Sequence, residues 1–348
     1  MTDYQKLTDF AVEKTCALLA IPSPSGCTER AISWLEEEFT ALGCAHWRGV
    51  KGGLIVDFGG RDDANALLLE SHCDTLGGMV AQIKANGRLR LTNIGGMNAN
   101  NAEAENAVLL SRNGKEYEGT LQLIDASIHV NGDYNDTKRS WDSVEFVLDE
   151  DVSSPEDVRA LGIGVGDYVC FDPRTRITAS GYIKSRYLDD KLSVGMLLAL
   201  AKYLNDESIT LPRRTYAHIT VYEEVGHGGC ASVPAGVTEA LVVDMGCVGE
   251  DLDCTERMVS ICAKDSSGPF CREIVLKLID AAERSGAKYA VDVYPHYSSD
   301  VATTLRAGSD VKHGLIGAGV YASHGYERSH VKGVENTLRL MEKYVEKA

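Results

Sequence analysis

Four apolar, strand-like runs of this chain each lead into residues that bind divalent metals. The residues that follow these runs are His72 with Asp74, Asp189 with Asp190, Glu223 with Glu224, and Asp244. A fifth candidate, His324, comes after the glycine-rich run 315–320. In open α/β sheets, side chains beyond the carboxyl ends of parallel strands converge on one edge. The pattern therefore predicts an α/β fold whose sheet edge carries the donors of a paired divalent-metal hydrolase site.

The size and charge of the chain limit the kinds of protein to which it can belong. Its 348 residues exceed one typical domain, which indicates two domains or one domain with a large insertion. A formal net charge of −16 argues against binding to a phosphate backbone, because nucleic-acid proteins need a basic face. We therefore expect no nucleic-acid partner.

The cysteines and the first residues bear on the compartment. Ten cysteines occur at irregular spacing without a C-x-x-C pair, which is typical of reduced thiols. Residues 1–6 lack a basic region followed by an apolar stretch, and no run approaches the ~20 apolar residues of a membrane span. We expect a cytoplasmic protein that does not enter a membrane.

The periodicity of the chain changes twice. Helical spacing over 7–20 and 28–42 is followed by strand-like runs at 54–58 and 66–70. From residue 76, short alternating runs flank Asn86-Gly87 and Asn113-Gly114, which are hairpin turn signals. An α/β rhythm returns after residue 178, with helices expected at 192–204, 269–285, 299–307 and 333–346 and strands at 215–222, 240–244, 289–294 and 313–318. We predict a β domain over 76–178 that interrupts an α/β domain made of 1–75 and 179–348.

Each candidate residue also has a plain structural interpretation. A lone His-x-Asp is commonly structural, and the Asp189-Asp190 pair at a helix start caps the first turn. Asp244 could simply start a turn, and His324 could be an ordinary surface histidine. Glu223 and Glu224 could be a solvated pair in a loop, but they are harder to explain in this way, because adjacent carboxylates repel each other unless a cation lies between them. The order of all these features along one α/β chain carries the metal hypothesis.

The chemistry of a two-metal hydrolase requires this set of groups. Two divalent cations need a bridging carboxylate, terminal ligands on each, and a bridging water that acts as the nucleophile. A further carboxylate must take the proton of that water and pass it to the leaving amine. Glu223 and Glu224 could divide the roles of ligand and base between them. Nitrogen and oxygen donors without thiolate suit Zn²⁺, Co²⁺ or Mn²⁺.

The order of these motifs resembles a known family. His-x-Asp, Asp-Asp, Glu-Glu-Val-Gly, Asp and then His is similar to the co-catalytic-metal aminopeptidases of the glutamyl and tetrahedral aminopeptidase type, some of which were labelled cellulases or endoglucanases. Comparable segments lie at 21–26, 77–80, 94–96, 162–167, 299–300 and 334–337. The resemblance implies a mixed-sheet, zinc-exopeptidase-like α/β sandwich. It also implies that the inserted, barrel-like β domain makes dimers, which can assemble into dodecamers.

The same resemblance implies a role for each site residue. His72 and Asp244 would be terminal ligands of one metal, Asp189 the bridge, and Glu224 with His324 the terminal ligands of the other metal. Glu223 would be the general base, and Asp74 would orient His72. The implied activity is hydrolysis of the N-terminal peptide bond of short peptides or amino-acid-derived substrates by a water that bridges two divalent ions, with zinc expected before cobalt or manganese.

The final histidine has a competitor in the sequence. His330 lies six residues beyond His324, in the stretch that differs most from the family pattern. His324 lies closer to the end of the predicted strand, and Gly325 allows the chain to turn away directly after it. We therefore expect His324 to close the site.

Three other functions compete with an aminopeptidase. A carboxypeptidase or N-acyl amidohydrolase could use the same dinuclear site, but the position of the insertion between Asp74 and Asp189 favours the aminopeptidase branch. A glycosidase needs two carboxyls ~5 to 9.5 Å apart and would leave His72, Asp244 and His324 unexplained. A non-enzymatic binding module would need neither the ligands nor the base, and all of them are present.

Overall fold

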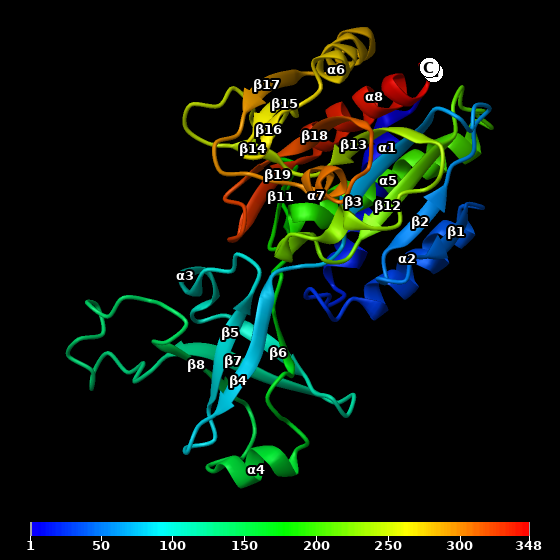
Figure 1. Ribbon diagram of the computed structural model, residues 1–348. Coiled ribbons are helices and arrows are strands. Elements are labelled where there is room, and N and C mark those ends of the chain that lie inside the picture. Colours follow the sequence, from blue (N-terminus) through cyan, green and yellow to red (C-terminus); the bar gives the residue numbers. More distant parts are fainter. Residues whose placement is uncertain (1, 348) are drawn as a thin grey trace. The chain divides into compact units, whose positions relative to one another are not determined.

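Strands and helices alternate along the chain in two compact units. The computed structural model describes residues 2–347. The first unit takes in the chain up to Asp74 and again from Arg174 onward, and the second unit is Thr75–Pro173. Each unit has its own sheet or barrel (Figure 1).

The first unit is built on a large mixed sheet. The main path runs β1 (Ala45–Arg48), β2 (Leu54–Asp57), β12 (Thr215–Thr220), β3 (Ala66–His72), β13 (Val237–Val243), β18 (Lys312–Tyr321), β19 (Glu327–His330), β11 (Tyr182–Ser185) and β10 (Arg176–Ile177). Four further strands join it: β14 (Gly246–Val248), β15 (Val259–Asp265), β16 (Gly268–Pro269) and β17 (Tyr289–Val293). The sheet therefore contains the strands that the sequence predicts in the α/β parts of the chain.

The centre of this sheet is parallel, and its strands end at one edge. β12 pairs in parallel with β3 so that Thr220 lies opposite His72. β13 also runs parallel to β3, with Val242 opposite Glu70, and β18 runs parallel to β13. Every residue of β3 is buried, as expected for a strand covered on both faces. The residues that follow β3, β12 and β13 consequently emerge side by side.

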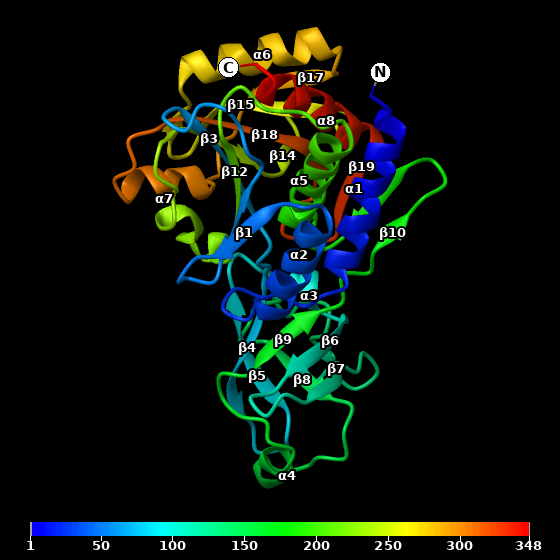
Figure 2. The ribbon, with the colours of Figure 1, turned by 90° about the vertical axis from the view of Figure 1, so that its right-hand side faces the viewer.

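Helices cover both faces of the sheet. They are α1 (Tyr4–Leu19), α2 (Glu29–Ala41), α5 (Leu188–Asp206), α6 (Arg272–Ser285), α7 (Asp300–Arg306) and α8 (Val331–Val345). α1, α5 and α8 pack against one another, while α7 contacts β3 and β13 on the other side (Figure 2). The last helix was predicted over 333–346, and its apolar stripe from Val334 to Val345 is buried in this packing.

The second unit is a closed barrel. Its strands follow the order β4 (Gly77–Ile83), β5 (Leu89–Ile94), β8 (Val144–Leu148), β7 (Glu116–Leu123), β6 (Asn106–Leu110) and β9 (Tyr168–Phe171). Neighbouring strands pair antiparallel, and the two predicted hairpins are β4–β5 and β6–β7. The unit also carries two short helices that were not predicted, α3 (Ala99–Ala102) and α4 (Pro155–Ala160). The predicted fold class, a mixed α/β sheet with an inserted β barrel, is confirmed.

Some strands give no clear signal in the sequence. β15 is buried on both faces, so its sequence lacks the apolar and polar alternation that marks a half-exposed strand. β19 reads Glu-Arg-Ser-His, which contains no apolar residue.

Among residues 2–347, no helix is long and apolar enough to cross a membrane.

Candidate metal centre

The predicted site residues converge at the carboxyl edge of the parallel strands. His72 ends β3, Asp189 and Asp190 lie in the first turn of α5, Glu223 and Glu224 begin the 3₁₀ turn η1 (Glu223–Val225) after β12, Asp244 follows β13, and His324 lies between β18 and β19. Their side chains come from five separate segments of the first unit. The sequence prediction of one shared location is therefore matched by the geometry.

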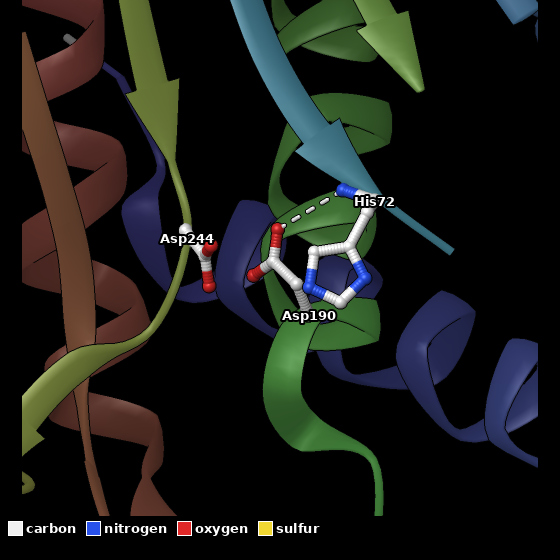
Figure 3. A group of neighbouring side chains, drawn as sticks. All are labelled: His72, Asp190 and Asp244. Carbon is white, nitrogen blue, oxygen red and sulfur yellow. Dashed lines mark hydrogen bonds between the residues drawn. The ribbon is translucent and has the colours of Figure 1, made fainter. Parts of the chain in front are cut away.

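One group of donors contains His72, Asp190 and Asp244. One ligand atom from each lies within 4.8 Å of the others, and all three side chains are buried. Figure 3 shows the two carboxyl groups facing each other below the end of β3. Asp190 is tied to the strand, because its Oδ2 accepts from the Ser71 hydroxyl at 2.5 Å and from the His72 backbone amide at 3.3 Å.

A second group shares His72 and adds Asp189 and Glu224. His72 Nε2 lies 3.1 Å from Asp189 Oδ1 and 3.8 Å from Glu223 Oε2. His324 Nε2 approaches from the opposite segment, 3.6 Å from Asp189 Oδ2 and 3.6 Å from Glu224 Oε2. Asp189 thus contacts both histidines, one with each carboxylate oxygen.

Asp74 makes further contacts besides the one that we expected with His72. His72 Nδ1 lies 3.0 Å from the backbone carbonyl oxygen of Asp74 and 3.5 Å from its carboxylate Oδ1. The carboxylate accepts from the Ser25 hydroxyl at 2.5 Å and from the backbone amides of Glu223 at 3.2 Å and Glu224 at 3.4 Å. Asp74 therefore holds the turn that carries both glutamates, besides lying beside His72.

His330 lies in another environment. Its Nε2 is 2.9 Å from the Ser180 carbonyl oxygen, and its Nδ1 accepts from the Lys332 backbone amide at the start of α8. Its ring also packs edge-on against Tyr182. These contacts make His330 a helix cap, whereas His324 lies against the carboxylate cluster.

Burial of so many carboxylates shifts their protonation. Burial, together with the charge of Asp189, raises the pKa of Glu224 well above its ordinary value, and burial also raises the pKa of Glu223. For Asp244, burial and the charge of Asp189 raise the pKa to about 7. Burial acts in the same direction on Asp189, but the hydrogen bond with His72 brings the pKa of Asp189 below its ordinary value. Without a cation, the cluster therefore retains protons that a divalent ion would displace.

Two buried carboxylate oxygens indicate whether a cation fits these residues. Within residues 2–347, Glu224 Oε1 and Asp190 Oδ1 are buried and have no hydrogen-bond partner. A buried carboxylate oxygen without a partner is costly unless a cation coordinates or neutralises it. Imidazole and carboxylate donors together suit Zn²⁺ and its neighbours in the transition series. The site therefore fits divalent metal ions.

An open pocket leads to the cluster. It has a volume of about 550 Å³, and its lining includes Asp189, Glu223, Glu224, Asp244 and His324. The opposite walls are formed by residues from 294–306, among them Tyr297 and Arg306. The side chain of Glu223 is 16% exposed and that of Glu224 only 3%, so Glu223 is the more accessible of the two.

Three buried carboxylates near the site were not assigned a role from the sequence. They are Glu70 and Asp300, which lie behind the cluster, and Glu327 at the start of β19. Glu70 did carry a signal, because a glutamate inside the apolar run of β3 is unusual. Asp300 Oδ1 accepts from the Gly229 amide at 2.7 Å, and its Oδ2 accepts from the Thr220 hydroxyl.

The buried carboxyl group of Glu70 predicts that the stability of the folded protein depends on pH. Burial and the charge of Asp300 raise the pKa of Glu70 to about 8. In the unfolded chain this carboxyl group has its ordinary pKa of 4.5, so the native state binds more protons between the two pKa values, and stability falls as pH rises through this interval. Glu70→Gln keeps the shape and cannot ionise. Calorimetry should show a Tm above that of the wild type at about pH 9 and a much smaller difference at about pH 5. An equal difference at both pH values would contradict this.

Comparisons with known proteins agree with the fold and the site. The family model for M42 glutamyl aminopeptidases matches residues 52–340. The provisionally named aminopeptidase YhfE of Bacillus subtilis (strain 168) is 42% identical over 99% of both chains. Two solved structures have the same fold at 22% identity. They are an aminopeptidase from Desulfurococcus kamchatkensis, with a TM-score of 0.87 over 98% of this chain and 96% of that one, and the TET1 peptidase of Pyrococcus horikoshii, with a TM-score of 0.86 over 97% and 100%.

The match to the family model covers most of the chain, and the relative from Bacillus subtilis is similar from end to end. The resemblance noted in the sequence is therefore confirmed. The chain belongs to the M42 glutamyl aminopeptidase family and is a metalloaminopeptidase that uses divalent metal ions.

Proposed function

We propose that this enzyme removes the N-terminal residue of short peptides at a site that holds two divalent metal ions. The observation that carries the proposal is the position of Asp189, which contacts His72 on one side and His324 on the other. A carboxylate placed in this way suits the bridge of a dinuclear site. We assign His72 and Asp244 to one ion, and Glu224 and His324 to the other.

The two adjacent glutamates differ in exposure, and we assign their roles from this difference. Glu224 is nearly buried and faces His324, which suits a ligand, whereas Glu223 is more open to the pocket. We assign Glu223 as the general base that accepts a proton from the attacking water and gives it to the leaving amine. Asp74 fixes the turn that carries both glutamates, because its carboxylate accepts from both backbone amides. Bound divalent ions would supply Lewis-acid activation of a peptide carbonyl and of water.

Asp190 has a different role in this proposal. Its Oδ2 is already engaged by Ser71 and by the His72 amide. Burial, and then the charge of Asp244, raise the pKa of Asp190 well above its ordinary value. We infer that Asp190 holds the end of β3 in place behind the cluster.

A substrate panel tests the reaction. Aminopeptidase activity requires a free α-amino group, so unblocked dipeptides and aminoacyl anilides should be hydrolysed in the presence of Zn²⁺, Co²⁺ or Mn²⁺. Their N-acetylated counterparts should not be cleaved. Cleavage of the N-acylated set, with the unblocked set untouched, would favour the carboxypeptidase or N-acyl amidohydrolase alternative.

The inserted barrel is a candidate for self-association. The loop between β7 and β8 exposes two apolar side chains close together in the sequence, Ile128 at 55% and Val130 at 77%, which a partner chain could cover. The related TET1 peptidase of Pyrococcus horikoshii assembles into a tetrahedron or a large octahedral shell. We infer that this chain forms homo-oligomers, from dimers up to dodecamers, through the unit Thr75–Pro173. Light scattering should give a mass well above the 37.7 kDa of one chain. The cytoplasmic location stays a prediction.

A further inference from the structure

Glu327 connects two parts of the site that lie far apart in the sequence. Its Oε2 accepts from the backbone amide of Asp189 at 3.0 Å. Its Oε1 accepts from the backbone amide of His324, also at 3.0 Å. Glu327 is only 2% exposed, so water cannot easily replace its carboxylate as the hydrogen-bond acceptor of these two amides. One buried carboxylate thus holds the main chain of two residues whose side chains meet in the cluster.

We propose that Glu327 is a positioning residue that holds Asp189 and His324 in the geometry required for metal binding. The inference rests on the proposed function, because it takes both residues as metal ligands. Glu327 itself would not touch the metal ions or the substrate. It would act through the two backbone segments that it joins.

The local backbone explains why such a clamp is needed. His324 has φ 61°, and Tyr187, which precedes α5, has φ 65°. Residues other than glycine rarely adopt this left-handed backbone conformation, and they keep it only where the surrounding structure imposes it. Both segments therefore need external anchors, and Glu327 supplies one to each.

The sheet fixes the position of the clamp. Glu327 is the first residue of β19, and its register with β11 places it opposite Ser185. The chain then passes from β11 into the start of α5, where Asp189 lies. The carboxylate is thus held at the junction between the end of β11 and the loop that carries His324.

Glutamine cannot replace this carboxylate in full. A carboxylate accepts with both oxygens, whereas a glutamine side chain has one acceptor oxygen and an NH₂ donor. In Glu327→Gln, one backbone amide would face another donor, so either Asp189 or His324 would lose its anchor. His324 contacts Asp189 and Glu224, so loss of its anchor would disturb the ion bound by Glu224 and His324. Loss of the anchor of Asp189, the proposed bridge, would disturb both ions.

The test is metal binding rather than turnover. Metal-free wild type and Glu327→Gln are titrated with Zn²⁺ in a calorimeter, and their Co²⁺ forms are compared by visible absorption. The control is Glu342→Gln, which alters another buried glutamate on α8. We expect Glu327→Gln to weaken at least one of the two Zn²⁺ sites by roughly 10- to 100-fold, as is typical for residues that orient ligands, and to change the Co²⁺ spectrum. Glu342→Gln should match the wild type.

Three results would overturn the inference. If the wild type binds two Zn²⁺ ions and Glu327→Gln matches it in affinity and spectrum, Glu327 positions nothing. If both sites weaken equally while the Tm of the metal-free variant collapses, Glu327 only supports the fold. If the wild type takes up no Zn²⁺, the proposed function fails, and the ligand roles used here fail with it. Should Glu327→Gln not fold, the same titration on Glu327→Asp, which keeps both oxygens on a shorter stem, decides between these outcomes.

Discussion

Glu223→Gln is expected to lower turnover by roughly 10² to 10⁴-fold while both metal ions stay bound, because general-base catalysis contributes about that factor. Glutamine has nearly the same shape and cannot accept the proton of the attacking water. The backbone amide of this residue still donates to Asp74, so the turn that carries Glu224 should not move. Steady-state kinetics on an aminoacyl anilide gives kcat, and elemental analysis of the dialysed protein gives the metal content.

The neighbouring glutamate provides the matched comparison. Glu224→Gln makes the same chemical change one residue along the chain, at a side chain that lies 3.6 Å from His324. It should lose metal as well as activity, since a neutral amide is a weaker donor than a carboxylate. If Glu223→Gln lost metal and Glu224→Gln kept it, the roles of ligand and base would have to be exchanged.

The location of the site could be predicted because strand ends are visible in a sequence. β3, β12 and β13 each read as apolar runs that stop at a polar residue, and parallel pairing brings such ends to one edge. No single residue established this location. It followed from the periodicity of the strands together with the order of the residues that follow them.

Contacts made by backbone groups could not be predicted in the same way. Glu327 lies in a polar strand with no apolar signal, and its partners are main-chain amides at distant positions. The carboxylate of Asp74 lies 3.5 Å from His72, as expected, but it also accepts from the backbone amides of Glu223 and Glu224, which the sequence did not indicate. A sequence shows which groups can accept hydrogen bonds, but the choice of donor depends on how the chain packs.

The fold also explains why the carboxylate cluster can exist. Like charges buried together destabilise a protein unless protons or cations compensate them. The parallel strands are held by extensive apolar packing around residues such as Leu68, Val242 and Leu315. This packing can support a site that is unfavourable when empty and becomes favourable when metal binds, because metal binding adds to folding stability.

Asp189→Asn is expected to abolish measurable activity and to reduce binding of both metal ions. Asp189 contacts His72 with one carboxylate oxygen and His324 with the other. An asparagine keeps the shape but offers a single acceptor oxygen without charge. Loss of a residue that merely orients a ligand costs roughly 10- to 100-fold in affinity, so loss of a shared ligand should cost at least about 100-fold at each site. Because metal ions supply several kcal/mol of transition-state stabilisation, kcat/KM should fall by about 10³-fold or more.

Two further variants show whether this effect belongs to a shared ligand. Asp206→Asn makes the same change at the exposed end of the same helix, where the side chain pairs with Lys202, and it should leave metal content and activity unchanged. His324→Ala should lose one metal ion per chain, because His324 lies against Asp189 and Glu224 but away from the group formed by His72 and Asp244. The expected metal counts after dialysis against a weak chelator are therefore two for Asp206→Asn, one for His324→Ala and none for Asp189→Asn. A count of one for Asp189→Asn would place this residue on a single ion and leave the bridging role to another carboxylate, with Asp190 the nearest alternative.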